Sequence, residues 1–219
     1  KRNYIAYNEL TNNSIGFNLT GDGNIFDSNR VHGNRLGIAI RSEKDVNART
    51  TLTKNLIWNN GKDIKRCEAG GSCVSNQRLG SIVFAVPALE HAGFVGSRGG
   101  GVVIEAAKLQ KTCTQPNEQG CNAIPNQNIQ APRLSYSKGQ VTATVQAQPN
   151  QRYQVEFFAN PQTKSQEAEQ YLGTQVVMTN AQGQGQAIWK VASGLASVTA
   201  NMTDHLGATS ELSSAIHIK

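Results

Sequence analysis

The residues best suited to chemistry lie close together in the first third of the chain. Arg30, His32 and Arg35 fall within a six-residue segment with Asp27 nearby, and Trp58 takes the place of His32 in a later sequence repeat. Guanidinium and imidazole groups donate hydrogen bonds to hydroxyls and carboxylates, and an indole ring offers a flat surface for stacking. Arg30, His32, Arg35 and Trp58 are therefore a candidate ligand-binding strip, with a sugar or uronate as the expected ligand. The alternative, an ordinary solvated sheet face, is left open by the sequence.

The sequence shows no recognisable set of catalytic groups beside this strip. None of the four histidines pairs visibly with a Ser or Cys nucleophile. The acidic residues of the region do not align as the two facing carboxylates that a glycosidase needs, since matching the repeats places Asp27 beside Ala6. We therefore expect no catalytic residue, no metal site and no cofactor in this chain.

A motif repeated three times must position the strip. It begins at Asn8, Asn29 and Asn55, with spacings of 21 and 26 residues. A period of about 20 residues suits one coil of a β-solenoid, in which apolar residues stack inward and Asn occupies the corners. The aligned copies predict three apolar columns and a second Asn column: Ile5, Phe26 and Leu52; Leu10, Val31 and Ile57; Phe17, Ile38 and Ile64; Asn13, Asn34 and Asn60.

The first two copies resemble the right-handed parallel β-helix family of secreted bacterial, pectate-lyase-like proteins, in which N-x-I-x-x-N-x-I-x-x-N-x-x-x-G-I recurs. Asn3 to Leu19 and Asn24 to Ile40 match this pattern, whereas the third copy places charged residues at 62, 63 and 66. The resemblance implies an exposed sheet face of the kind on which polysaccharide lyases, hydrolases and epimerases act. It also implies that Lys1 lies within a coil, so we expect upstream residues of the same protein, or a partner, to cover the open N-terminal end.

Composition and charge narrow the function further. The net charge is +6, but the basic residues are scattered and form no run, which argues against nucleic acid. Attraction to an acidic polysaccharide or a surface glycan is reasonable on the same grounds, as is a basic surface without a partner. No stretch is long and apolar enough to span a membrane.

Four cysteines occur as two close pairs, Cys67 with Cys73 and Cys113 with Cys121. Two local disulfides are the simplest interpretation and predict an oxidising compartment, so the protein would be secreted, periplasmic or at the cell surface. A zinc site built from the four thiolates is the alternative, although the spacings lack the tight C-x2-C pattern.

From Pro132 onward, short segments of alternating polarity are separated by turns, which is typical of a β-sandwich. This half resembles the immunoglobulin-like module that follows β-helix coils in secreted bacterial proteins, through YQVEFFANP at 153–161, EAEQYLGT at 167–174 and VTANMTDHLGATSELS at 198–213. The predicted fold is therefore all-β, with right-handed parallel β-helix coils over 1–130 followed by an immunoglobulin-like β-sandwich over 131–219.

Three functions fit these features. We favour a secreted or surface-displayed fragment that acts in carbohydrate binding, adhesion or assembly without catalysis of its own. The first alternative is the C-terminal portion of a polysaccharide lyase, hydrolase or epimerase whose active site lies on upstream coils. The second is a component of a multiprotein cell-envelope assembly.

Overall fold

The computed structural model describes residues 2–13, 15–34, 36–41, 49–60, 65–67, 73–75, 82–85, 126, 129–161 and 167–219. Arg35, Cys113 and Cys121 lie outside these residues, as does the strand-like segment GVVIEA at 101–106. For Cys67 and Cys73 the structure describes the backbone, and the two residues face each other in the antiparallel pair of β9 (Lys65–Cys67) and β10 (Cys73–Ser75). Both disulfides stay predictions.

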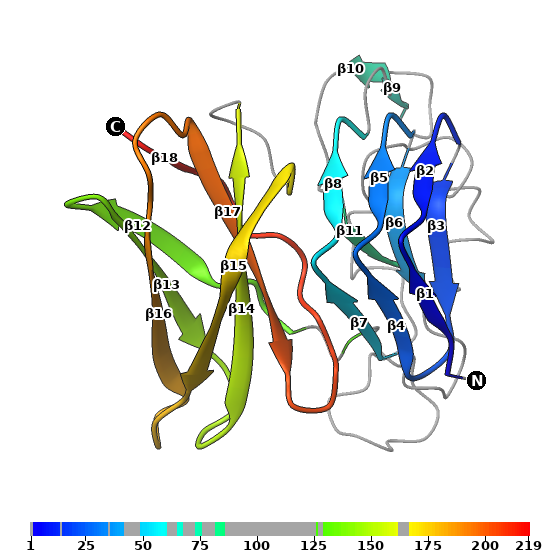
Figure 1. Cartoon of the computed structure of the whole chain (residues 1–219). Coiled ribbons are helices and arrows are strands. Elements are labelled where there is room, and N and C mark those ends of the chain that lie inside the picture. Colours follow the sequence, from blue (N-terminus) through cyan, green and yellow to red (C-terminus); the bar gives the residue numbers. More distant parts are fainter. Residues whose placement is uncertain are drawn as a thin grey trace.

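Three parallel sheets of stacked strands make up the N-terminal part, which we call the coil unit (Figure 1). The first sheet holds β1 (Tyr4–Ala6), β4 (Asn24–Asp27) and β7 (Thr50–Thr53), and the second holds β2 (Glu9–Thr11), β5 (Arg30–His32) and β8 (Leu56–Trp58). The third holds β3 (Ile15–Thr20), β6 (Leu36–Arg41) and β11 (Ile82–Ala85). From β1 to β8, every third strand therefore returns to the same sheet, and β11 follows β6 in the third sheet in place of β9.

The predicted register is confirmed in the first two sheets and wrong at one point in the third. Phe26 pairs with Ile5 and Leu52, and Val31 pairs with Leu10 and Ile57. In the third sheet, Ile82 and not Ile64 takes the place beside Ile38. The reason is chemical, because the segment around Ile64 carries Lys62, Asp63 and Arg66, whereas the Ile82–Ala85 segment is wholly apolar.

Two ladders of asparagine side chains join the coils at their corners, as predicted. The Asn8 backbone N–H donates to Asn29 Oδ1 over 2.9 Å, and the Asn29 N–H donates to Asn55 Oδ1 over 2.9 Å. The second ladder runs through Asn13, Asn34 and Asn60 in the same way. The buried amides thus satisfy backbone donors that the turns leave without a strand partner.

Replacing Asn55 by Ala should cost at least about 2 kcal/mol of unfolding free energy. Asn55 is 3% exposed, accepts from the Asn29 N–H and donates to the Phe26 carbonyl over 2.7 Å. Its loss leaves two buried polar groups without partners, each costing about 1–3 kcal/mol. The control is Asn8→Ala in the same ladder. It should lower the unfolding free energy by about 1 kcal/mol or less, because water can replace the hydrogen bonds of the exposed Asn8 side chain. Urea denaturation of both variants checks this, and equal losses would contradict it.

The C-terminal part consists of two antiparallel sheets that face each other, and we call it the sandwich. One sheet has the order β12 (Arg133–Ser137), β13 (Gln140–Gln146) and β16 (Gln184–Lys190). The other has the order β15 (Gln170–Met178), β14 (Arg152–Asn160), β17 (Ser197–Asp204) and β18 (Ile216–His217). Tyr153, Val155 and Phe157 are buried between the sheets, as the alternation predicted.

Residues 211–218 have the alternating polarity of a strand, but only Ile216–His217 forms one. The Ser210 and Ser213 N–H groups donate to the Met202 and Ala200 carbonyls, while their hydroxyl oxygens accept from the N–H groups of the same two residues. Serine hydroxyls thus stand in for backbone acceptors along this side of β17. The predicted fold class and the boundary near residue 130 stay predictions.

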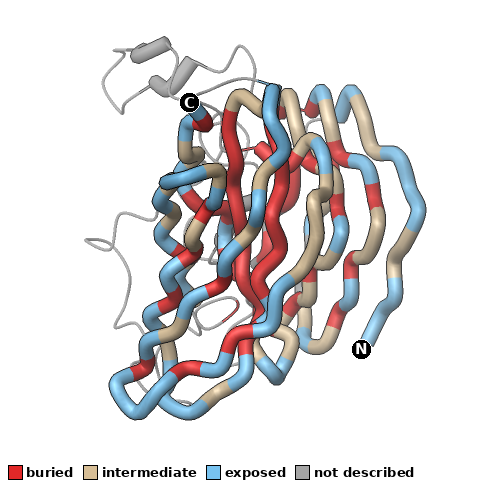
Figure 2. The backbone as a smooth tube through the Cα atoms, turned by 60° about the vertical axis from the view of Figure 1, so that its left-hand side comes forward, coloured by how far each residue is buried: buried red, intermediate tan, exposed pale blue. Residues whose placement is uncertain are grey.

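The sandwich covers the end of the coil unit, beside β7 and β8 (Figure 1). Burial is nearly continuous along β17 and the second half of β14, in the middle of the molecule (Figure 2). Phe158, Ala168 and Leu212 belong to the same apolar core as Phe26 and Ile57 of the coils. The apolar side chains of the sandwich therefore close the core of the coil unit.

Backbone N–H groups of the last coil also find acceptors outside the coil unit. Without a further coil, the N–H groups of β7 and β8 would form an open sheet edge. Five N–H groups of these strands and of the residues that directly follow them donate elsewhere: Thr50 to Asn126 Oδ1, Leu52 to Thr209 Oγ1, Lys54 to the Glu156 carboxylate, Ile57 to the Ala168 carbonyl and Asn59 to Glu167 Oε1. In the coils before it, the corner N–H groups of Tyr7 and Ser28 donate to carbonyls of the next coil, so Glu156 replaces such a carbonyl.

The Glu156 carboxylate should make the stability of this interface depend on pH. Glu156 is 3% exposed and accepts from Thr53 Oγ1 over 2.8 Å and from the Lys54 N–H over 3.1 Å. Burial raises the pKa of Glu156 above its ordinary value of 4.5, and the hydrogen bonds from Thr53 and Lys54 oppose this shift only in part. Because the pKa of Glu156 is higher in the folded protein than in the unfolded chain, its titration stabilises the folded state most fully below pH 4.5. This contribution to the unfolding free energy is lost as the pH rises through the pKa of Glu156 in the folded protein.

We therefore expect the unfolding free energy of the wild type, relative to Glu156→Gln, to be greatest in acid and to decline toward neutral pH. The glutamine keeps the shape and an acceptor oxygen but does not titrate. Urea denaturation of both proteins over a pH series measures the difference. A difference that is constant with pH, or that grows on going to neutral pH, would show that Glu156 does not titrate in this way.

Candidate functional site

The candidate site lies on the outer face of the β2–β5–β8 sheet. Strand residues alternate between faces, so Leu10, Val31 and Ile57 pack into the core while their neighbours point outward. The parallel register places Thr11, His32 and Trp58 in one outward column, as the alignment predicted. The second outward column holds Glu9, Arg30 and Leu56. The fold thus brings Arg30, His32 and Trp58 together.

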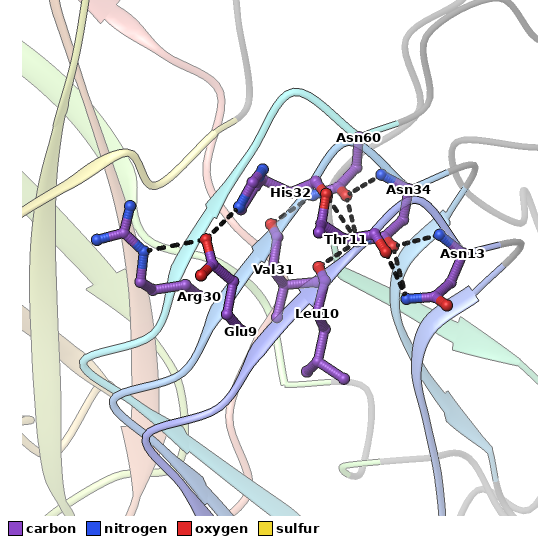
Figure 3. Close-up of polar contacts among 9 residues, drawn as sticks. All are labelled: Glu9, Leu10, Thr11, Asn13, Arg30, Val31, His32, Asn34 and Asn60. Atoms are coloured by element: carbon purple, nitrogen blue, oxygen red, sulfur yellow. Dashed lines mark hydrogen bonds and ion pairs between the residues drawn. The ribbon is translucent and has the colours of Figure 1, made fainter.

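Glu9 is the central group of the site, and sequence reasoning did not select it. Its Oε1 lies 2.9 Å from His32 Nε2 and 3.8 Å from Arg30 Nε (Figure 3). The 21-residue offset that pairs Asn8 with Asn29 also pairs Glu9 with Arg30, so the same alignment contained the signal. We refer to Glu9, Arg30, His32 and Trp58 as the Glu9–His32 site.

Trp58 forms the wall of this site on the side of the last coil. Its ring is stacked on the His32 imidazole, with centroids 4.2 Å apart and planes inclined by 17°. Arg30 Cζ lies 5.3 Å from the same ring, within the range of a cation–π contact. The His32 side chain is 23% exposed, so one part of the imidazole is covered and another remains open to a ligand.

The surroundings of Glu9 keep its carboxyl ionised. The hydrogen bond from His32 is the largest cause that lowers the pKa of Glu9, and the positive charge of Arg30 adds to it, against a smaller opposing effect of desolvation. An ionised carboxylate only accepts hydrogen bonds, so His32 Nε2 carries the proton in this contact. A neutral His32 then has its lone pair on Nδ1, and that nitrogen is the one able to take up a proton.

Asp27 does not join this site, although it is close to Arg30 in sequence. It lies on β4 in the neighbouring sheet, beside Ala6, where it accepts from Tyr4 Oη over 2.6 Å and from Ser28 Oγ over 2.8 Å. Within the described ranges, no group of three or more His, Cys, Asp or Glu residues is arranged to hold a metal ion. A search of the same residues finds no helix with the length and apolarity needed to cross a membrane.

The chain is closely similar to part of an enzyme. It is 76% identical over 205 residues to a curated protein named 3-dehydroshikimate dehydratase, from Acinetobacter baylyi. The match covers 94% of this chain and 42% of that relative, so the chain spans less than half of the relative's length. No model of a protein family matches the chain.

This similarity corrects the functional predictions made from the sequence. The relative is a dehydratase, which contradicts a fragment that serves adhesion, carbohydrate binding or envelope assembly without catalysis. The activity in its name also does not fit a polysaccharide lyase, hydrolase or epimerase. The identification as a pectate-lyase-like repeat protein is also wrong, since the relative is a dehydratase. Coil geometry alone does not determine function.

Other predictions are not tested by these findings. The oxidising compartment stays a prediction, as does a partner or upstream segment at the first coil. Arg35 cannot be placed relative to the Glu9–His32 site, since it lies outside the described residues.

Proposed function

We propose that this chain forms part of a dehydratase that acts on 3-dehydroshikimate, and that the Glu9–His32 site takes part in the proton transfers. The 76% identity to a protein of that name supports the activity. The observation that carries the site assignment is the 2.9 Å contact between the Glu9 carboxylate and the His32 imidazole on an open sheet face.

The reaction needs one proton removed and one supplied. 3-Dehydroshikimate is a cyclic keto acid with a hydroxyl on the carbon β to its ketone. Loss of water requires a base for the C–H next to the ketone and an acid for the departing hydroxyl. The resulting ring tautomerises to an aromatic catechol acid.

His32 has the chemistry for both transfers. In its neutral form, Nδ1 takes the proton from the carbon next to the ketone, and the imidazolium is stabilised by the Glu9 carboxylate. As the C–O bond breaks, the same proton passes to the leaving oxygen and water is released. Glu9 is unchanged at the end and serves to orient His32.

Arg30 and Trp58 suit the binding of this substrate. Arg30 has an exposed side chain that can pair with the ring carboxylate of the substrate, and a guanidinium fits a carboxylate with two parallel hydrogen bonds. The indole of Trp58 provides an apolar surface beside His32 against which a six-membered ring can lie. The site therefore offers partners for the carboxylate and the ring of the substrate.

Turnover by the purified protein tests the proposal. Incubation with 3-dehydroshikimate should produce the near-ultraviolet absorbance of the aromatic acid at a rate proportional to protein concentration. Shikimate, which has an alcohol in place of the ketone, should give no product, because its C–H is not acidified. An absence of product from 3-dehydroshikimate at high protein concentration would contradict the proposed activity.

A further inference from the structure

The strand that carries Trp58 is held from outside the coil unit. The Ile57 N–H donates to the Ala168 carbonyl over 2.8 Å, and the Ala168 N–H donates to the Ile57 carbonyl over 2.7 Å. One residue after Trp58, the Asn59 N–H donates to Glu167 Oε1 over 2.9 Å. Two consecutive residues of the sandwich therefore bind the backbone on both sides of Trp58.

The bond from Asn59 fixes the peptide group that begins at the Trp58 carbonyl carbon. Asn59 has a φ of 55°, in the left-handed region where a non-glycine residue needs support from its surroundings. Glu167 is 8% exposed, and a hydrogen bond to a carboxylate is stronger in such a buried place than in water. Glu167 thereby supports the turn by which the chain leaves β8, directly after Trp58.

The segment that carries Glu167 is itself firmly anchored. Thr199 on β17 donates its hydroxyl to the Glu167 carbonyl, and the Glu169 N–H donates to Asn160 Oδ1 at the end of β14 over 3.0 Å. Ala168 is fully buried in the core shared by the coils and the sandwich. The backbone that carries Glu167 is thus held by two strands of the sandwich.

We propose that Glu167 is a positioning residue for the Glu9–His32 site, acting through Trp58. It holds the Trp58–Asn59 peptide, Trp58 lies against the His32 ring at 4.2 Å, and His32 carries the proton in the reaction. The catalytic relevance of this inference rests on the proposed function. The sandwich then sets the geometry of the site as well as closing the coil core.

Glu167→Met tests the inference, because methionine has a similar length but no strong acceptor for the Asn59 N–H. The ring-current shift of the His32 imidazole protons, recorded by NMR without substrate, should decrease in this variant. Turnover should show kcat lowered roughly ten- to 100-fold, as expected for misplaced catalytic groups, and KM raised as well, because Trp58 also borders the substrate ring. Glu167→Gln keeps an acceptor oxygen and should restore most of both readouts.

Two comparisons make the outcome decisive. Glu169→Met, the same change two residues along, should leave the His32 shift and kcat at their wild-type values. Ala168→Gly keeps the backbone hydrogen bonds but loosens the segment, so it should change both readouts in the same direction by less, and it remains informative if Glu167→Met does not fold. A wild-type His32 shift and kcat in folded Glu167→Met would overturn the inference. A wild type without turnover would overturn the proposed function instead, and the NMR shift would still decide the role of Glu167.

Discussion

Replacing His32 by Gln should lower kcat/KM for 3-dehydroshikimate by about 10²- to 10⁴-fold, the range that general acid–base catalysis contributes. Glutamine can still bond to the Glu9 carboxylate through its amide, so the local structure should persist. It has no lone pair of suitable basicity to take a proton from carbon. Steady-state kinetics with the aromatic product as the readout measures the effect.

The matched control is His205→Gln, which changes the same residue type in an exposed turn of the sandwich. This variant should have wild-type kinetics. Glu9→Gln should fall between the two, because it keeps a hydrogen bond to His32 but removes the charge that stabilises the imidazolium. Full activity in His32→Gln would exclude His32 as the proton carrier.

Replacing Phe158 by Ala should destabilise the protein by about 3–5 kcal/mol, the usual cost of deleting a buried aromatic side chain. Phe158 is 1% exposed, and its ring centroid lies 5.9 Å from that of Tyr171. Its side chain belongs to the core of the coil unit, although its strand is part of the sandwich. The loss of stability should therefore be greatest where the sandwich meets the coil unit.

Hydrogen exchange locates this loss, with Phe157→Ala as the control. Phe157 is the preceding residue on β14, and its side chain points into the core between the two sheets of the sandwich. Phe158→Ala should accelerate exchange mainly in β7 and β8, whereas Phe157→Ala should accelerate it mainly in β13 and β16. The same exchange pattern in both variants would mean that the coil core does not depend on the sandwich.

The coil unit could be predicted from the sequence wherever the repeat is regular. Parallel strands that stack in register turn a fixed offset in sequence into a fixed neighbour in space, so Asn8 predicts Asn29, and His32 predicts Trp58. The prediction was wrong in the third sheet, where Ile82 of a later apolar segment, and not Ile64, lies beside Ile38.

The contacts between the two parts could not be predicted in the same way. Glu156 and Glu167 lie more than 100 residues from the backbone groups that they bind, with |i−j| of 102 and 108, and no repeat relates them to the coils. In the sequence, Glu156 is an acidic residue within an apolar strand, and nothing there indicates which backbone groups it binds. Glu9 was predictable in position, but its role depends on a diagonal contact to His32 that the column alignment does not show.

The most direct test of the proposed site is NMR of the histidine rings during titration with shikimate, which keeps the ring carboxylate and hydroxyls but cannot lose water by the same route. The protein has four histidines, so each ring can be assigned by substitution. Binding at the Glu9–His32 site should shift the His32 ring resonances in a saturable way and leave those of His205 and His217 unchanged. Saturable shifts in other histidines with an unchanged His32, in a protein that turns over 3-dehydroshikimate, would place the active site elsewhere and contradict the assignment.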